Sequence, residues 1–300
     1  MPAYISHAIF GEDVYYKISE DSLLFRTPVC LEEVKTYSLG VDLAIFAKNI
    51  NPHNQNTQAF FLNMIKYIKE HNLMDIPEVM SLLYGHIAHY FLDINMHPFI
   101  FYLEKGCEQI GTISNHNLVE GYLSSYMADK LLSKDIMDVK ASYFNQADIK
   151  FGLNNTLLNE VYSKTYGEPK IFSSYRNVLL VLTALENIIK SPLVTKKMLI
   201  KISGFQEFLE RNNLTLSELT NETNETYFNP VTGEKNKANV LELYARSLEM
   251  TLDALLKVNG YLYGNLSLSS LESVFTNLSY DTGVSCDLGK KFTFVKQIER

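Results

Sequence analysis

Residues Ala238–Asn259 read ANVLELYARSLEMTLDALLKVN, and this stretch decides the fold class. Apolar side chains recur in it every three or four residues, the spacing that gathers them on one face of an α-helix. The side chains on that face are Leu241, Tyr244, Ala245, Leu248, Leu252, Leu255 and Leu256. We therefore expect an amphipathic helix that packs on a core through this face and ends near Gly260.

The same spacing recurs along the chain and predicts an all-α protein. Thr57 is placed to cap one further helix, and Pro77 suits the first turn of another. A third begins at Ser173 or Ser174 and runs through Ile189. Since period-two alternation is rare, strands are expected to contribute little.

A single domain is the simplest organisation. The chain has 300 residues, 46% of them hydrophobic and 20% charged, which is typical of a globular protein. Because neither repeats nor a composition shift divide it, we expect one compact multi-helix domain over residues 1–300, with the motifs in 1–130 and further helices in 131–300. Within it, Asn212–Asn239 is the longest loop candidate, either a lid or a surface loop, and Lys291–Val295 is a candidate short strand.

The charge balance and the cysteines exclude several classes of protein. A formal charge of -7 disfavours a nucleic-acid binder, which needs a basic surplus to displace counterions from phosphates. Three widely spaced cysteines favour neither a disulfide framework nor a thiolate zinc site. The first residues lack the pattern of a signal peptide and no apolar run reaches the roughly 20 residues of a membrane span, so we expect a cytoplasmic protein with at most peripheral membrane contact.

The clearest candidate metal ligands lie in Tyr84–Pro98, whose sequence is YGHIAHYFLDINMHP. On a helix, His89 and Asp93 lie one turn apart on the same side, close enough to hold one metal ion. Asp93 and His97 are also four residues apart, so they would lie on that same side of the helix. Pro98 predicts that the helix ends there and re-aims His97.

Further donors of the same two types lie on either side. The full candidate set is His7, Asp42, His53, His89, Asp93, His97, His116 and Glu120. Imidazole and carboxylate without thiolate suit zinc or a similar divalent ion. Eight donors exceed the four that close one structural zinc and fall short of closing three. Open positions for water and substrate therefore remain, which is typical of a catalytic site.

Each of these residues also has an ordinary interpretation. A lone histidine on a helix is usually packed or at the surface, and we expect this for His71 and for His86. His86 is also placed to support His89, one turn further on. His89 with Asp93 alone fits a hydrogen-bonded pair as well as a metal site, and Asp42 alone fits a turn. Only the whole set favours a metal cluster.

The order and spacing of the set resemble the bacterial zinc-dependent phospholipase C family, which is related to secreted zinc nucleases. That family has an early His, a Gly-x-x-Asp, a His before a helix with Phe-Phe, a His-x-x-x-Asp followed by His-Pro, and a His-x-x-x-Glu. The corresponding residues here are His7, Gly40-Val41-Asp42 with a gap one residue shorter, His53 ahead of Phe60-Phe61, His89 to Asp93 with His97-Pro98, and His116 to Glu120. Weaker similarity to the family at Asn229–Gly233 and Leu278–Gly283 extends the resemblance toward the C-terminus.

The resemblance implies an all-helical fold that holds three zinc ions. One ion would take Asp42, His53, His89 and Asp93, a second His97, His116 and Glu120, and a third His7, a shared Asp93 and the amino group of the N-terminus. The secreted members present an N-terminal Trp, whereas this chain contains no Trp. We accordingly expect two to three zinc ions.

The resemblance also implies the reaction. Zinc would lower the pKa of a bound water, which attacks phosphorus in line, with Asp42 as ligand and general base. Three divalent ions and three carboxylates would leave a site charge of about +3, which attracts a phosphodiester. We therefore expect a phosphodiester hydrolase that acts on phospholipid head groups. A zinc nuclease or soluble phosphoesterase, and a non-catalytic metal-binding helical scaffold, stay open as alternatives.

Overall fold

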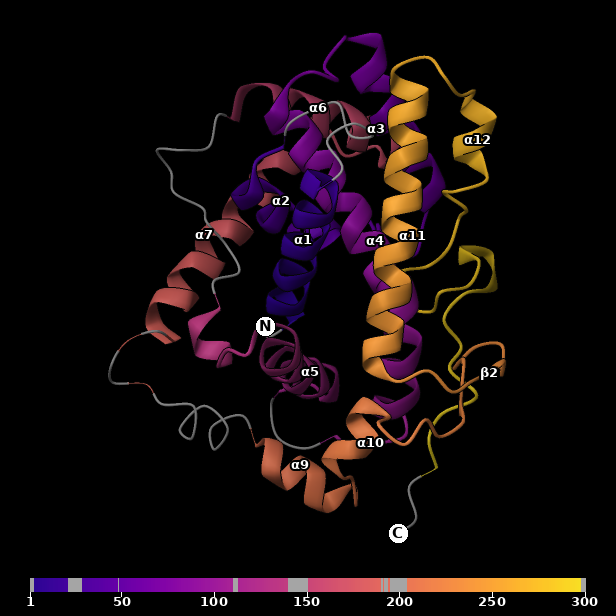
Figure 1. Cartoon of the computed structure of the whole chain (residues 1–300). Helices are drawn as coiled ribbons and strands as arrows, with labels where there is room; N and C mark the ends of the chain where they lie inside the picture. The colour runs from indigo at the N-terminus through magenta and orange to yellow at the C-terminus, as the bar shows by residue number, and fades with distance from the viewer. Residues whose placement is uncertain are drawn as a thin grey trace.

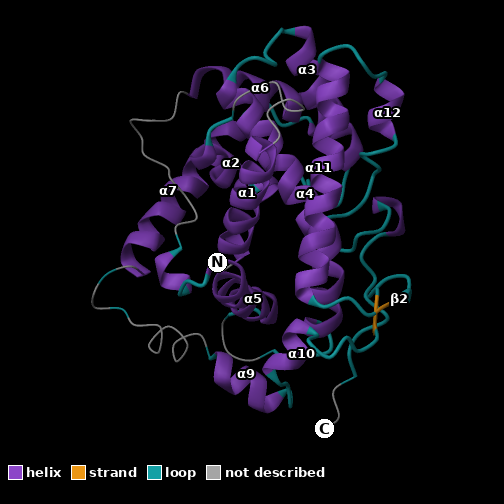
Figure 2. Ribbon diagram, viewed as in Figure 1, coloured by secondary structure: helices purple, strands orange, loops and turns teal. Residues whose placement is uncertain are grey.

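The structure is a computed structural model that describes residues 3–20, 29–47, 49–109, 113–139, 151–189, 191, 194 and 204–297. Helices make up almost all of the regular structure in these ranges, as Figure 2 shows. The predicted all-α class is therefore confirmed.

The elements follow one another in a simple order (Figure 1). The α-helices are α1 (Ala3–Glu20), α2 (Leu31–Tyr37), α3 (Thr57–Glu70), α4 (Pro77–Glu104), α5 (Asn115–Leu132), α6 (Phe151–Tyr166), α7 (Ile171–Ile189), α9 (Phe205–Arg211), α10 (Leu216–Thr220), α11 (Val240–Leu262) and α12 (Leu268–Glu272). The 3-10 helices are η1 (Gly40–Ala44), η2 (Ile136–Asp138) and η3 (Cys286–Leu288), and the strands β1 (Tyr227–Phe228) and β2 (Lys235–Asn236) pair antiparallel.

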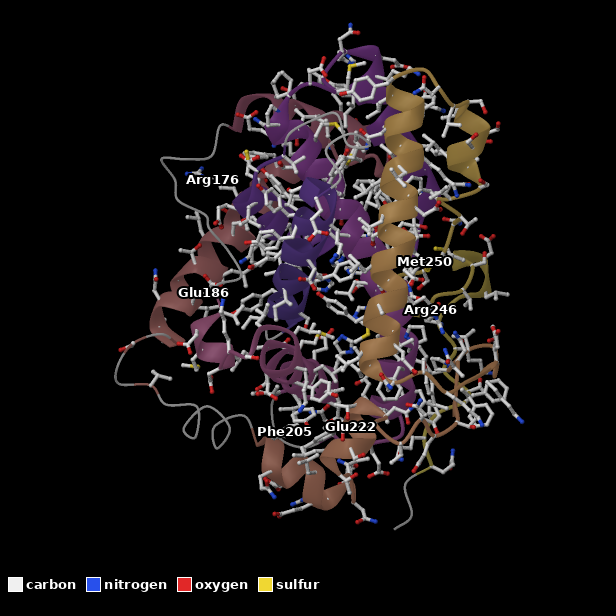
Figure 3. All side chains as sticks on the ribbon, in the orientation of Figure 1. Arg176, Glu186, Phe205, Glu222, Arg246 and Met250 are labelled. Atoms are coloured by element: carbon white, nitrogen blue, oxygen red, sulfur yellow. The ribbon has the colours of Figure 1, made fainter. Side chains whose placement is uncertain are left out.

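The 28-residue helix α4 is the centre of the molecule. It contacts α1, α2, α5 and α11, and α11 runs alongside it in Figure 1. Side chains fill the space between these helices, as the sticks of Figure 3 show. Because neighbours cover α4 on several sides, its buried residues occur around most of its circumference rather than in one stripe. Pro77 begins the helix, as predicted, where its missing N–H costs nothing.

The predicted end of α4 at Pro98 is wrong, because the helix continues to Glu104. Proline cannot donate a hydrogen bond to the carbonyl of Ile94, four residues earlier. Gly283 packs on that carbonyl and on the proline ring, and a Cβ there would collide with the Ile94 oxygen. The C-terminal segment Leu278–Val284 therefore lies against α4 at the proline, and His97 keeps a helical position.

The expected helix at Ala238–Asn259 is confirmed, but its end and its buried face differ from the prediction. Helix α11 passes Gly260 and ends at Leu262. Ala245 and Leu256 are exposed, and Leu241, Leu248 and Leu252 are only partly buried. The buried face instead includes Ser247 and Thr251, whose hydroxyls donate to the helix's own carbonyls at 2.8 and 2.7 Å. Small side chains satisfied in this way can be buried between helices, which periodicity of apolar residues does not reveal.

Two helices begin at other positions than predicted, and the hydroxyls of Thr57 and Ser174 make tertiary hydrogen bonds instead of capping them. Thr57 is the first residue of α3 rather than its cap, and its hydroxyl donates to the carbonyl of Leu278 at 2.8 Å. Helix α7 begins at Ile171, ahead of both predicted serines. Ser174 is buried, and its hydroxyl donates to the carbonyl of Leu43 at 3.1 Å.

The segment Asn212–Asn239 is not one long loop. It contains α10 and the β1–β2 hairpin, in which Tyr227 pairs with Asn236. Asn221 organises it by donating from its side chain to three backbone carbonyls. Lys291–Val295 is not a strand in the described structure, because it pairs with no extended partner there.

None of the helices in the described ranges is both long and apolar enough to cross a bilayer.

Candidate metal centre

All eight predicted donors lie around the middle of α4. Helix α4 contributes His89, Asp93 and His97, while α1 brings His7, η1 brings Asp42, the turn before α3 brings His53, and α5 brings His116 and Glu120. They form three groups, namely His7, His89 and Asp93; Asp42, His53 and His89; and His97, His116 and Glu120. Within each group the ligand atoms lie within 4.8 Å of one another.

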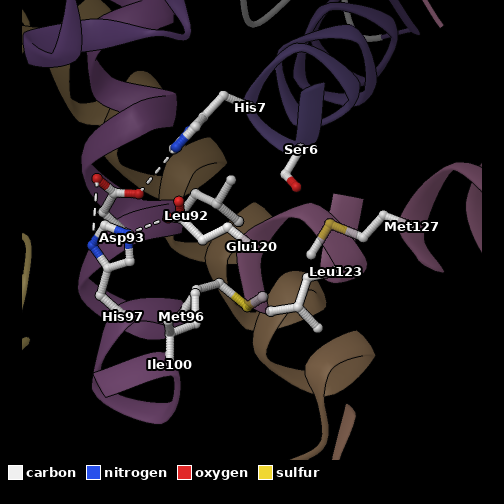
Figure 4. A pocket seen from close by; sticks show the side chains of 10 residues that line it. All are labelled: Ser6, His7, Leu92, Asp93, Met96, His97, Ile100, Glu120, Leu123 and Met127. Carbon is white, nitrogen blue, oxygen red and sulfur yellow. Dashed lines mark hydrogen bonds and ion pairs between the residues drawn. The ribbon is translucent and has the colours of Figure 1, made fainter. Parts of the chain in front are cut away.

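Asp93 lies at the junction of the groups, and Figure 4 shows its carboxylate between His7 and His97. Its Oδ1 is 3.3 Å from Nε2 of His7, and its Oδ2 is 3.2 Å from Nε2 of His89. The same Oδ2 is 3.8 Å from Nδ1 of His97. A single carboxylate thus faces three imidazoles, the arrangement expected of a ligand shared between two ions.

The central atoms test whether these residues fit a metal. Nε2 of His89 and Oδ2 of Asp93 are buried and have no hydrogen-bond partner among the described residues. Leaving one such group unsatisfied costs about 1–3 kcal/mol. Nδ1 of His89 lies 3.1 Å from the carbonyl of Ser38, which leaves Nε2 free to act as a ligand. A divalent cation would satisfy both orphaned atoms, so the donor set fits a metal.

The charge state of the inner histidines also suits ligation. Burial lowers the pKa of His7 to about 4, and burial is also the largest cause that lowers the pKa of His89 well below its usual value. Both rings are therefore neutral at neutral pH, which is the form that binds metal. Burial raises the pKa of Asp93 well above its ordinary range, as expected for a carboxyl enclosed without a compensating cation.

The second group is the most open of the three. Nε2 of His53 lies 2.9 Å from Oδ1 of Asp42, and the Asp42 side chain is 42% exposed. Burial would raise the pKa of Asp42, but the hydrogen bond from His53, the largest opposing cause, helps to hold the pKa well below its usual range. Gly40 has φ +48°, and a Cβ there would collide with the His89 ring. Glycine therefore lets η1 bring Asp42 close to α4.

The third group is tied together by Glu120. Its Oε1 lies 3.2 Å from Nε2 of His97 and 3.0 Å from Nε2 of His116. Burial would lower the pKa of His97, but the charges of Asp93 and Glu120 raise it to about 10. Ser114 caps α5 by accepting from the N–H of Asn117 at 3.2 Å, which fixes the first turn that carries His116.

The two remaining described histidines have the ordinary roles predicted for them. His71 is exposed and stacks on Tyr67 with ring centroids 3.9 Å apart. His86 is buried, with Nδ1 2.8 Å from the carbonyl of Leu82 and Nε2 2.7 Å from the hydroxyl of Tyr175. The N-terminal amino group, which the resemblance implies as a ligand, lies outside the described residues.

A pocket of about 310 Å³, including its open side, adjoins the donors (Figure 4). Its lining residues are Ser6, His7, Leu92, Asp93, Met96, His97, Ile100, Glu120, Leu123 and Met127. One wall is therefore made of candidate ligands and the other of apolar side chains from α4 and α5. The sequence analysis missed this apolar wall, although Leu123 and Met127 have the four-residue spacing that places them on one face of α5.

Tyr280 belongs to the Leu278–Gly283 stretch that resembles the family, but the sequence analysis assigned it no role; in the structure it touches the site from the C-terminal segment. Its N–H donates to the carbonyl of His53 at 2.9 Å, and its own carbonyl lies 3.1 Å from Nδ1 of His97. Both contacts use backbone atoms, so no side-chain pattern in the sequence signals them.

In a comparison with known proteins, the chain matches one family model. Residues 33–170 match the family model described as zinc dependent phospholipase C. The matched span contains every donor of the site except His7. No curated protein and no solved structure matches the chain significantly.

Proposed function

We propose that this chain hydrolyses the head-group phosphodiester of a phospholipid, because residues 33–170 match the model of the zinc-dependent phospholipase C family. The products would be diacylglycerol and a phosphorylated head group. The family supports a hydrolase of the phospholipase C type, and the choice of phospholipid as substrate is our proposal.

The observation that carries the proposal is the pair of buried, unsatisfied atoms on His89 and Asp93, 3.2 Å apart at the junction of three donor groups. Two to three zinc ions would be held there, with Asp93 shared between two of them. Bound zinc supplies Lewis-acid chemistry, since it polarises a phosphoryl oxygen and makes water nucleophilic near neutral pH.

Asp42 is the residue best placed to accept a proton. It is ionised at neutral pH, because its pKa is held low chiefly by the hydrogen bond from His53. Its 42% exposure contrasts with 3% for the Asp93 side chain, so water reaches Asp42 directly. We therefore assign Asp42 as general base as well as ligand, and Asp93 as a ligand alone.

The apolar wall of the pocket favours a lipid over a nucleotide. Leu92, Met96 and Leu123 stand beside the candidate ligands and offer no hydrogen-bonding groups to a base or sugar. Leu92 and Leu123 are 2% exposed and Met96 is 4% exposed, so we infer that a phospholipid meets them only at the open side of the pocket, where its glycerol part would gain from the contact. The net charge of -7 also disfavours a polyanionic strand.

The test compares two conservative variants of equal charge change. Asp93→Asn removes the shared carboxylate, whereas Asp253→Asn removes an exposed carboxylate that pairs with Lys257 on the surface of α11. Zinc content by elemental analysis and hydrolysis of short-chain phosphatidylcholine, an oligonucleotide and a soluble bis-aryl phosphate would be measured for both and for the wild type.

We expect two to three zinc ions and lipid hydrolysis in the wild type and in Asp253→Asn. Asp93→Asn should bind less zinc and lose at least about 100-fold in activity, since it removes a metal ligand. Full activity in Asp93→Asn would refute the mechanism. Activity on the oligonucleotide or soluble diester alone would favour the alternative substrates, and bound zinc without turnover would favour the scaffold.

A further inference from the structure

Glu104, the last residue of α4, is a buried carboxylate that none of the eight donors includes. It is 5% exposed, and its Oε1 forms no hydrogen bond with the described residues. Nδ1 of His116 lies 4.0 Å from this oxygen and is also buried without a hydrogen-bond partner in the described ranges. Two groups of complementary chemistry, neither of them hydrogen-bonded, therefore face each other at the edge of the metal centre.

The imidazole of His116 is held between two carboxylates. Its Nε2 is 3.0 Å from Oε1 of Glu120, on the side of the candidate metal group, and its Nδ1 faces Glu104. The ring of Phe101 packs on the imidazole with centroids 4.9 Å apart and an angle of 30° between the planes. The orientation of His116 is therefore set by these neighbours from three directions.

Hydrogen bonds join the start of α5 to the end of α4 close to the contact between His116 and Glu104. The side-chain amide of Asn115 donates to the backbone carbonyls of Glu104, Cys107 and Glu108 at 3.5, 3.3 and 3.3 Å. Because Asn115 immediately precedes His116, these bonds fix how far the imidazole stands from the Glu104 carboxylate.

Two other histidines of the centre direct the corresponding nitrogen to a fixed acceptor. Nδ1 of His89 lies 3.1 Å from the carbonyl of Ser38, and Nδ1 of His97 lies 3.1 Å from the carbonyl of Tyr280. Metal-binding histidines generally donate their second ring N–H in this way, which sets the tautomer and strengthens the ligand.

We propose that Glu104 is the positioning residue of His116: when a metal ion is bound, its carboxylate closes the 4.0 Å gap to Nδ1, accepts the Nδ1 proton and presents Nε2 to the ion held with His97 and Glu120. The inference rests on the proposed function, since it assigns a role toward the same ions. It adds a residue that lies outside the ligand set and acts through His116.

Lys105 offers the competing explanation for Glu104. Its Nζ is 2.9 Å from the same Oε1, although without hydrogen-bond geometry, and its side chain is 42% exposed. Solvent screens the Lys105 end of this pair, whereas the Glu104 carboxylate is only 5% exposed. If the pair with Lys105 were the only role of Glu104, removing either partner would have the same effect.

The experiment therefore compares four variants in the full chain. Glu104→Leu removes the acceptor, and Glu104→Gln keeps an acceptor oxygen without the charge. Lys105→Met removes only the ion pair, and Glu108→Gln changes an exposed carboxylate on the same connection. Affinities for Zn²⁺ and Co²⁺ would be measured by chelator competition, together with the visible absorption of the Co²⁺ form, which reports the ligand geometry.

We expect Glu104→Leu to weaken one bound ion by about 10- to 100-fold and to change the Co²⁺ absorption. Glu104→Gln should show a smaller loss, while Lys105→Met and Glu108→Gln should match the wild type. Wild-type affinity and absorption in Glu104→Leu would overturn the inference, as would an equal loss in Lys105→Met.

If Glu104→Leu does not fold without metal, the comparison of Glu104→Gln with Lys105→Met decides: a loss in the first alone supports the inference, and equal behaviour overturns it. Failure of the wild type to bind any metal would instead refute the proposed function, so the two failures are distinguishable.

Discussion

The backbone carbonyl of Tyr280 lies 3.1 Å from Nδ1 of His97, so a residue of the C-terminal segment orients a donor in the middle of α4. The segment reaches this place because Gly283 packs where Pro98 leaves the Ile94 carbonyl without its helical donor. The carboxyl-terminal part of the chain, outside the matched residues 33–170, therefore helps to build the site.

Gly283→Ala should disturb this contact. Gly283 has φ +65°, and a Cβ would collide with the Ile94 oxygen, so the segment must move away from α4. We expect a loss of about 1–3 kcal/mol in the free energy of unfolding and weaker metal binding at His97. Chemical denaturation and chelator competition would measure the two effects.

Gly264→Ala is the matched control. Gly264 has φ +84°, yet a Cβ there meets nothing within 4 Å, so this variant carries the backbone strain without the collision. Equal effects of the two substitutions on metal binding would show that contact with α4 is not what matters at Gly283.

Zinc should stabilise the folded protein through Asp93. A ligand that binds only the folded state adds about 2.7 kcal/mol at a concentration 100 times its dissociation constant. Because the unsatisfied His89 and Asp93 atoms lie at the junction of the groups, adding a chelator should lower the Tm of the wild type and of Asp253→Asn. Asp93→Asn should respond less, and a full response in that variant would remove Asp93 from the metal centre.

Stability at mildly acidic pH should depend on His86. Burial lowers its pKa to about 4 in the folded protein, below the 6.5 of an unperturbed histidine. Between these values the unfolded chain binds more protons, so the contribution of His86 is complete above pH 6.5 and is lost as the pH falls toward 4. It amounts to about 2 kcal/mol between pH 7 and pH 5.

The measurement is urea denaturation of chelator-treated protein at both pH values. His86→Gln should lose about 2 kcal/mol less than the wild type on going from pH 7 to pH 5, whereas His71→Gln, which changes an exposed histidine, should follow the wild type. An unchanged pH dependence in His86→Gln would contradict the assignment.

The apolar wall of the pocket should affect lipid substrates selectively. Met96→Gln keeps the length of the side chain but makes the wall polar, so we expect KM for a phospholipid to rise about 10-fold, in line with the 1–3 kcal/mol typical of one apolar contact. Turnover of a soluble bis-aryl phosphate should change little.

Met250→Gln is the control for this substitution, because Met250 is 36% exposed on α11 and does not line the pocket. A parallel loss on lipid and soluble substrates in Met96→Gln would show that the residue supports the metal centre rather than the lipid.

Local spacing in the sequence was enough to predict the fold class and to propose the inner candidate donors. Helical spacing is a local property, since 3.6 residues per turn place positions four apart on one face whatever surrounds them. The amphipathic stretch in α11 and the pairs His89 with Asp93 and His116 with Glu120 could therefore be recognised without coordinates. The motif order added the more distant donors through a family resemblance.

Only the tertiary structure decided which residues orient those donors and where the helices end. The Tyr280 carbonyl is a backbone atom without a sequence pattern, and Glu104 reads as an ordinary acid at a helix end until burial removes its solvent. Pro98 predicted a helix end, but packing of Gly283 allowed α4 to continue. These features depend on contacts between segments far apart in the chain, which local periodicity cannot encode.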